Sequence, residues 1–153
     1  MIMTKNYLIL MAEDDADDRL LVKDALAECG VNEGVRFVAD GEELVDYLLR
    51  RGKYEKAGDS PRPDLVLLDL NMPRKDGREA LKEIRANASL RRMPVVVFTT
   101  SRADTDIEKV YELGANSFVT KPAAFDELVS TMAKVTGYWF GVVELPETPT
   151  VLA

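Results

Sequence analysis

Acidic residues directly follow two of the apolar runs of this sequence, in positions where a carboxylate could react or bind a cation. Asp69 comes directly after the run Leu65–Leu68, and Glu13 and Asp14 follow the run at residues 6–12. A carboxylate at the end of a buried run is costly unless it has a partner. No helix pattern begins at Asp69, because the letters LNMPRKDG come next, so helix capping does not explain this acid. We therefore expect Asp69 to react or to face a cation.

The composition restricts the chemistry that these acids can serve. The chain of 153 residues has no histidine and one cysteine, Cys29. Ser-His-Asp triads, Cys-His pairs and histidine metal sites are excluded within the chain, which leaves carboxylates, hydroxyls, lysines or a metal ion. The net charge of -7 opposes binding to nucleic acid, and no apolar run approaches the roughly 20 residues of a membrane span. We expect one cytoplasmic domain, with neither nucleic acid nor a membrane as its partner.

Strand and helix patterns alternate five times along the chain. Apolar runs of strand length lie at residues 6–12, 35–39, 64–70, 94–100 and 117–121. Segments with helical spacing lie at residues 15–30, 41–52, 76–90, 104–114 and 125–139. Continuous hydrophobicity in the third and fourth runs indicates strands that are covered on both faces. The order predicts a flavodoxin-like, doubly wound α/β fold with a five-stranded parallel sheet of order 2-1-3-4-5 and helices on both faces.

Two local features complete the predicted fold. Asp15 and Asp17 suit the N-terminus of the first helix, and Asp104 suits that of the fourth, where a carboxylate accepts from free backbone N–H groups. The polar segment at residues 51–63 is predicted to be a surface loop rather than a domain boundary.

The predicted sheet brings the acids together. Ligands bind at the carboxyl ends of such strands, and strands one and three are neighbours, so Glu13, Asp14 and Asp69 converge. Close carboxylates repel by about 4 kcal/mol per pair at an effective dielectric constant of about 20, so a cation must lie among them. Lys121, at the end of the fifth strand, is one candidate, and the other is a hard divalent ion, Mg²⁺ or Mn²⁺. Such a set describes a phosphoryl site with Asp69 as nucleophile and a threonine hydroxyl as donor.

Four motifs, taken together, resemble the receiver domain of bacterial two-component response regulators over roughly residues 5–136. They are ED at residues 13–14, LLDLNMPRKDG around Asp69, VVVFTTS with Thr99, and FVTKP with Lys121. The resemblance implies that Asp69 accepts a phosphoryl group from a phosphohistidine on a separate sensor histidine kinase.

The resemblance also implies roles for single residues. The Mg²⁺ ligands that it implies are Glu13, Asp14, Asp69 and the backbone carbonyl of Asn71. Thr99 and Phe118 are implied as a switch pair. Lys121 is implied as the phosphate-binding lysine, with a cis bond to Pro122.

Two other functions compete with this interpretation. A phosphatase of haloacid-dehalogenase type also uses an aspartyl nucleophile at a strand end, but it carries an acid two positions later, where this chain has Asn71. A phosphorylation-independent interaction module is the second alternative. The presence of every acid, hydroxyl and lysine of the site argues against it.

The C-terminal residues suggest the partners. We expect a receiver domain at residues 1–136 and a tail at residues 137–153 that is too short for an output domain, so the receiver acts alone through protein contacts. The apolar residues of this tail are Tyr138, Trp139, Phe140, Val142, Val143 and Leu145. Exposed, they would form a patch that predicts a homodimer, and the alternative is that they fold back on the domain. The tail and the loop at residues 51–63 resemble single-domain regulators that partner phytochrome-type sensor kinases.

Overall fold

The computed structural model describes residues 6–31 and 34–146. The strands in chain order are β1 Ile9–Ala12, β2 Val35–Val38, β3 Leu65–Leu68, β4 Val95–Thr99 and β5 Ser117–Thr120. The helices are α1 Ala16–Glu28, α2 Gly41–Leu49, α3 Gly77–Ala86, α4 Asp104–Glu112 and α5 Phe125–Gly141. The alternation that the sequence predicts is confirmed, with strands that are shorter than the apolar runs.

The five strands form one parallel sheet of order β2-β1-β3-β4-β5, as predicted. Ala12 of β1 pairs with Leu68 of β3, so the two strands end side by side. The Asp69 N–H then donates to the Ala12 carbonyl at 3.1 Å. This register places the acids that follow β1 and β3 at the same edge of the sheet.

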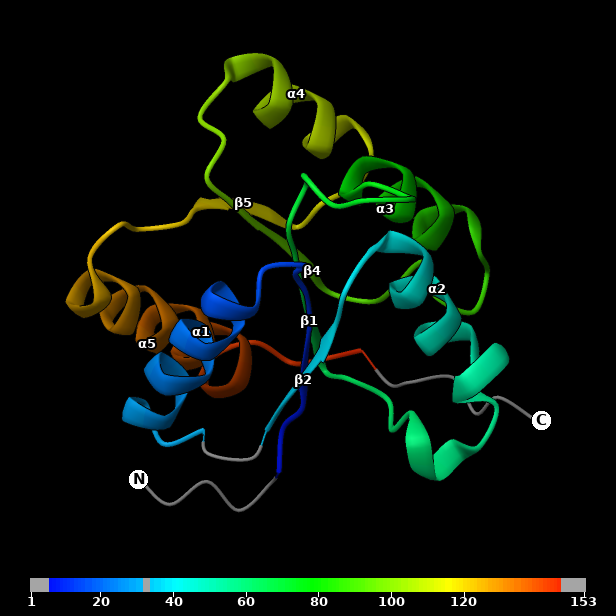
Figure 1. Cartoon of the computed structure of the whole chain (residues 1–153), viewed down its shortest axis with the longest axis horizontal. Coiled ribbons are helices and arrows are strands. Elements are labelled where there is room, and N and C mark those ends of the chain that lie inside the picture. Colours follow the sequence, from blue (N-terminus) through cyan, green and yellow to red (C-terminus); the bar gives the residue numbers. More distant parts are fainter. Residues whose placement is uncertain (1–5, 32–33, 147–153) are drawn as a thin grey trace.

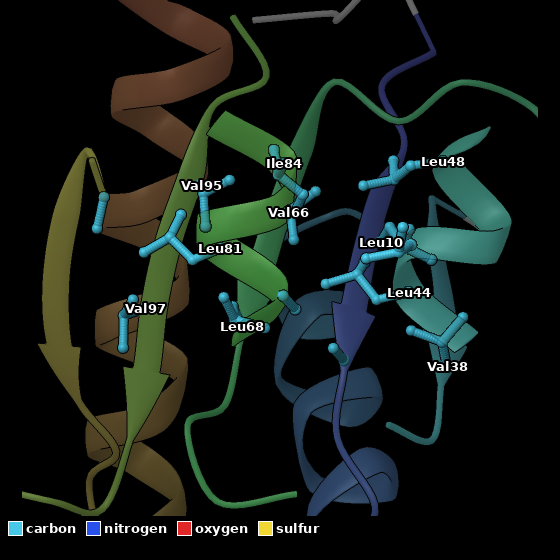
Figure 2. Close-up of a cluster of buried hydrophobic side chains, with 14 of the residues drawn as sticks. Leu10, Val38, Leu44, Leu48, Val66, Leu68, Leu81, Ile84, Val95 and Val97 are labelled. Carbon is cyan, nitrogen blue, oxygen red and sulfur yellow. The ribbon is translucent and has the colours of Figure 1, made fainter. Parts of the chain in front are cut away.

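Two hydrophobic cores lie on opposite faces of the sheet. Helices α1 and α5 pack together over one face, and α2 and α3 cover the other (Figure 1). On the second face, Leu44 of α2 and Leu81 of α3 join the side chains of the central strands (Figure 2). Strands β1, β3 and β4 are buried along their whole length, as their continuous hydrophobicity indicates. The ends of these three strands are therefore supported by buried side chains on both faces of the sheet.

Aspartates cap three of the helices. Asp15 caps α1 by accepting from the N–H groups of Asp17 and Asp18, while Asp40 and Asp76 cap α2 and α3. The prediction that Asp17 caps the helix is wrong in detail. Asp17 lies in the first turn of α1, and its backbone N–H donates to the side chain of Asp15.

The prediction that Asp104 caps α4 is also wrong. Asp104 is the first residue of the helix, and Ala103 occupies the N-cap position without a side-chain hydrogen bond. Asp104 and Asp106 instead lie in the first turn, where negative charge favours the positive end of the helix dipole.

The predicted loop at residues 51–63 is mostly exposed and contains two short 3₁₀ helices, η1 Gly52–Tyr54 and η2 Ala57–Asp59. It is fastened to α2, because the Tyr47 hydroxyl donates to the Pro61 carbonyl at 2.7 Å and Arg62 donates to the Leu48 carbonyl at 2.7 Å. The segment therefore belongs to the same domain.

Helix α5 continues to Gly141, beyond residue 136, where the sequence predicts the end of the receiver domain. Met132, Thr136 and Phe140 form a buried stripe at helical spacing, and the Phe140 ring stacks on Tyr7 with 4.3 Å between ring centroids. Two other apolar residues of the tail, Trp139 and Leu145, pack against the same core. Much of the predicted patch therefore folds back. Its large exposed members are Tyr138 and Val142, whose relative exposed areas are 53% and 72%.

Among the described residues, no helix is both long enough and apolar enough to cross a membrane.

Candidate phosphoryl and metal site

Three carboxylates meet where β1 and β3 end, as the sequence predicts. Ligand oxygens of Glu13, Asp14 and Asp69 lie within 4.8 Å of one another. Glu13 and Asp69 are buried, whereas Asp14 is exposed. An all-oxygen set with one side open to solvent suits a hard divalent cation.

Lys121 places its ammonium group among these acids. Its Nζ atom forms an ion pair with Glu13 and lies 3.5 Å from Asp69 Oδ2. The Lys121 N–H donates to the Thr99 carbonyl at 2.8 Å, which fixes the start of the loop after β5. The side chain is only 10% exposed, so its charge acts at close range in a poorly solvated place. The predicted convergence of the lysine with the acids is confirmed.

Burial and crowding shift the pKa values of the paired groups. Burial is the main cause that raises the pKa of Glu13 to about 7, and the charge of Asp69 adds to it, while the bond from Lys121 opposes both. Burial would lower the pKa of Lys121, but its bond to Glu13 and the charges of Asp69 and Glu13 raise it above the ordinary value. Lys121 therefore stays charged, and the buried acids favour additional positive charge.

The Thr99 hydroxyl is an unusual feature of the site. Thr99 ends β4 and is fully buried, and its Oγ1 atom has no hydrogen-bond partner among the residues that the structure describes. A buried polar group without a partner costs roughly 1–3 kcal/mol. The residues present therefore fit a bound divalent ion and a phosphoryl group, because the acids offer oxygen ligands and a hydroxyl donor is available at the adjoining strand end.

The other two predicted residues lie nearby. Asn71 is exposed in the loop after β3, two positions beyond Asp69. Phe118 is partly buried against the core that α2 and α3 cover, and its backbone N–H donates to the Tyr111 hydroxyl at 3.1 Å. It pairs across the sheet with Val97, two positions before Thr99. A carbonyl ligand at Asn71 and a switch role for Phe118 stay predictions.

Two residues that sequence reasoning did not place in the site contribute to it. Asp18, in the first turn of α1, brings Oδ2 within 3.4 Å of Lys121 Nζ. Arg19 donates from Nε to the Glu13 carbonyl at 2.7 Å and so holds the turn between β1 and α1. Their helical positions carry no signal of this, because the contacts depend on how α1 packs beside the sheet.

Gly77 holds the loop after β3 close to Asp69. The Gly77 N–H donates to the Leu70 carbonyl at 2.9 Å, and a Cβ atom at Gly77 would overlap the Asp69 carbonyl. Only glycine fits this approach. The Lys121–Pro122 bond is trans, so the cis bond implied by the resemblance is wrong for this structure. Either isomer is accessible to a bond before proline.

A doubly wound parallel sheet with a buried aspartate, further acids and a lysine at its carboxyl edge defines the class of receiver domains. Residues 9–133 match the response regulator receiver domain, and the chain belongs to this family.

Among similar proteins is the response regulator Rcp1 of Synechocystis sp., which is 40% identical over 139 residues that cover 91% of this chain and 92% of Rcp1. The crystal structure of the phosphorylated cyanobacterial phytochrome response regulator RcpA has a TM-score of 0.86 and 40% identity, and the match covers 94% of this chain and 100% of RcpA. The Mn²⁺-bound form of Rcp1 has a TM-score of 0.82 and 39% identity, with 92% and 99% coverage. An acidic cluster in this chain is consistent with the divalent metal named for that structure.

Proposed function

We propose that this chain accepts a phosphoryl group on Asp69 from the phosphohistidine of a sensor histidine kinase and signals through protein contacts. The observation that carries the proposal is the position of Asp69, with Lys121 Nζ at 3.5 Å and two further acids within 4.8 Å. Such an arrangement supports a carboxylate nucleophile whose product, an acyl phosphate, would be neutralised by Lys121 and by a divalent ion held by the acids.

In the proposed transfer, a carboxylate oxygen of Asp69 attacks the phosphorus of the phosphohistidine. The new O–P bond forms as the N–P bond breaks, and the imidazole nitrogen keeps the bonding electrons. Lys121 offsets charge on the phosphoryl oxygens, and the partnerless hydroxyl of Thr99 donates to one of them. Because Asp69 directly follows the fully buried strand β3, its carboxylate needs little reorganisation for the attack.

The proposed metal is Mg²⁺, with Mn²⁺ as a substitute. Glu13, Asp14 and Asp69 would hold it, with the backbone carbonyl of Asn71 as a further ligand. A divalent ion bound there neutralises charge on the phosphoryl oxygens.

The chain would catalyse only its own phosphorylation and a slow hydrolysis. In that hydrolysis water attacks the phosphorus, inorganic phosphate leaves, and the Asp69 carboxylate is restored. A phosphatase of haloacid-dehalogenase type is disfavoured, because Asn71 stands where such an enzyme carries an acid-base residue. An interaction module without phosphorylation is disfavoured by the complete set of acids, lysine and buried hydroxyl.

The proposed partner is a sensor kinase of phytochrome type, and the proposed location of this chain is the cytoplasm. RcpA is described as a phytochrome response regulator, and the match covers the whole of that chain. The net charge of -7 disfavours nucleic acid as a partner. We also propose a homodimer that forms through the C-terminal part of α5, where Tyr138 and Val142 remain exposed.

The first experiment is phosphorylation of the purified chain by acetyl phosphate, followed by mass spectrometry. We expect one added phosphoryl group that requires Mg²⁺ or Mn²⁺ and that is absent from Asp69→Asn. Asp24→Asn, which removes an exposed acid of α1, is the matched control and should react like the parent. Phosphorylation of Asp69→Asn to the same extent as the parent would show that the nucleophile is another residue.

The second experiment identifies the kinase. Phosphorylated candidate kinases are mixed with the chain for short times, and the rates of transfer are compared. A phytochrome-type kinase is expected to transfer fastest. Equal or faster transfer from unrelated kinases would contradict the proposed partner.

A further inference from the structure

Helix α4 is held with little apolar contact. Val110 is its only buried residue among Asp104–Glu112, and no side chain caps its N-terminus. It stands at the outer end of the sheet beside β5 (Figure 1). Burial of apolar side chains normally fixes a helix, so the position of α4 depends more than usual on polar contacts.

Asp106 makes the polar contacts at the N-terminal end of α4. Its Oδ1 atom accepts from Arg78 Nη2 of α3 at 2.6 Å, and its Oδ2 atom accepts from the Ser101 hydroxyl at 2.6 Å. These bonds to Ser101 and Arg78 lower the pKa of Asp106, so it is charged at neutral pH. One carboxylate thus joins α3, α4 and the loop between β4 and α4.

The loop that Asp106 holds leads directly from the proposed site. Ser101 lies two positions after Thr99, whose hydroxyl has no partner within residues 6–31 and 34–146. At the other end of α4, the Tyr111 hydroxyl accepts from the Phe118 N–H at 3.1 Å. Both ends of the helix are therefore tied to segments that carry the two predicted switch residues.

We propose that Asp106 is a positioning residue that, through Ser101 and Arg78, holds the loop between β4 and α4 in the arrangement that opposes phosphoryl uptake at Asp69. When the Thr99 hydroxyl bonds a phosphoryl oxygen, the chain at Thr99 is drawn toward Asp69 and pulls on Ser101. The bonds of Asp106 resist that shift, so their loss favours the phosphorylated arrangement. The inference rests on the proposed function of Asp69.

The test compares rates of phosphoryl uptake from acetyl phosphate at saturating Mg²⁺. We expect Asp106→Ala to react about fivefold faster than the parent, at the lower end of typical coupling between sites. Arg78→Gln should change the rate in the same direction. The double variant should be no faster than the faster single variant, because both changes break one network.

Two variants control for other effects. Asp46→Ala removes a carboxylate that pairs with Arg51 at 3.0 Å on α2, and should leave the uptake rate unchanged. Arg78→Lys keeps the positive charge, so its uptake rate should lie closer to that of the parent than the rate of Arg78→Gln does. Circular dichroism checks that each variant is folded, and Asp106→Asn replaces Asp106→Ala if the latter is not.

The possible results separate the two proposals. If the parent takes up phosphate and the Asp106 and Arg78 variants match its rate while unfolding at lower temperature, the network is merely structural and the inference is overturned. If the parent takes up no phosphoryl group at all, the proposed function fails and the inference fails with it.

Discussion

At the scale of single residues, the site combines groups whose interactions are incomplete within the chain. Glu13 has its pKa raised to about 7 mainly by burial, which means that its charged form is poorly compensated. The Thr99 hydroxyl is buried without a partner in the described part of the chain. Both features are costs to the folded protein that a metal ion and a phosphoryl oxygen would offset.

Asp14 provides a test of the metal ligands. We expect Asp14→Asn to unfold at a higher temperature than the parent without divalent ions, because it relieves repulsion from Glu13 and Asp69. At about 100 times its Kd, a ligand raises the free energy of unfolding by about 2.7 kcal/mol, which is the scale expected for Mg²⁺ and the parent. Stabilisation by the same concentration of Mg²⁺ should be smaller in the variant. Thermal unfolding with and without Mg²⁺ measures both. Asp24→Asn should respond to Mg²⁺ like the parent, and an equal response from Asp14→Asn would argue against Asp14 as a ligand.

Thr99 separates stability from function. Thr99→Val keeps a similar shape and removes a buried hydroxyl that has no partner, so the free energy of unfolding should rise by about 1 kcal/mol. Phosphoryl uptake from acetyl phosphate should fall, because a donor to the phosphoryl oxygens is lost. Urea unfolding and the uptake assay check the two effects. A variant that is less stable than the parent would mean that Thr99 Oγ1 has a partner in solution.

At the scale of elements, glycine contacts determine how closely the loop after β3 approaches Asp69. We expect Gly77→Ala to lower the free energy of unfolding by about 3 kcal/mol, because the added methyl group overlaps the Asp69 carbonyl. Phosphoryl uptake should fall with it, since relief of the overlap displaces the backbone of the nucleophile.

Gly137 is the matched control for Gly77. It lies inside α5, where an added Cβ would meet no described atom within 4 Å beyond its chain neighbours and the helix's own backbone. Gly137→Ala should raise the free energy of unfolding by about 0.5–1 kcal/mol, because alanine favours a helix. Urea denaturation measures both variants, and equal effects would contradict the close contact at Gly77.

The sequence was sufficient to predict the strands, their order and the convergence of the acids with Lys121. These follow from continuous apolar runs and from the geometry of parallel sheets, which are both properties of patterns. The positions of Asp18 and Arg19 could not be predicted, because they depend on the packing of α1. The network of Asp106, Ser101 and Arg78 was missed for the same reason, since its members are brought together only when α3 and α4 lie side by side.

The end of α5 shows a different limit of sequence reasoning. The sequence pattern predicts a helix over residues 125–139, and it leaves open whether the aromatic residues at its end form an exposed patch or fold back on the domain. In the structure Thr136 belongs to the buried stripe. Its hydroxyl donates to the Met132 carbonyl at 2.8 Å, so it is hydrogen-bonded without water. A polar residue in that position conceals the continuation of the stripe to Phe140.

At the scale of the whole molecule, this finding changes how the proposed homodimer must be tested. Removal of the residues after Gly137 would delete Phe140, and the loss of a buried aromatic side chain costs about 3–5 kcal/mol. Such a truncation would confuse unfolding with dissociation. The exposed residues Tyr138 and Val142 can be changed without disturbing the ring stacking between Phe140 and Tyr7.

We therefore predict that the full chain sediments as a dimer at tens of micromolar and that Tyr138→Lys with Val142→Lys converts it to a monomer. Two added charges at a desolvated contact are costly, whereas the same charges on a free surface are tolerated. Leu20→Lys with Leu21→Lys, on the exposed part of α1, is the matched control and should remain dimeric. The thermal midpoints at low concentration should be similar for both variants.

A parent chain that sediments as a monomer, with or without acetyl phosphate and Mg²⁺, would contradict the dimer. If the parent and the Tyr138 and Val142 variant are both dimers, the contact lies on another face.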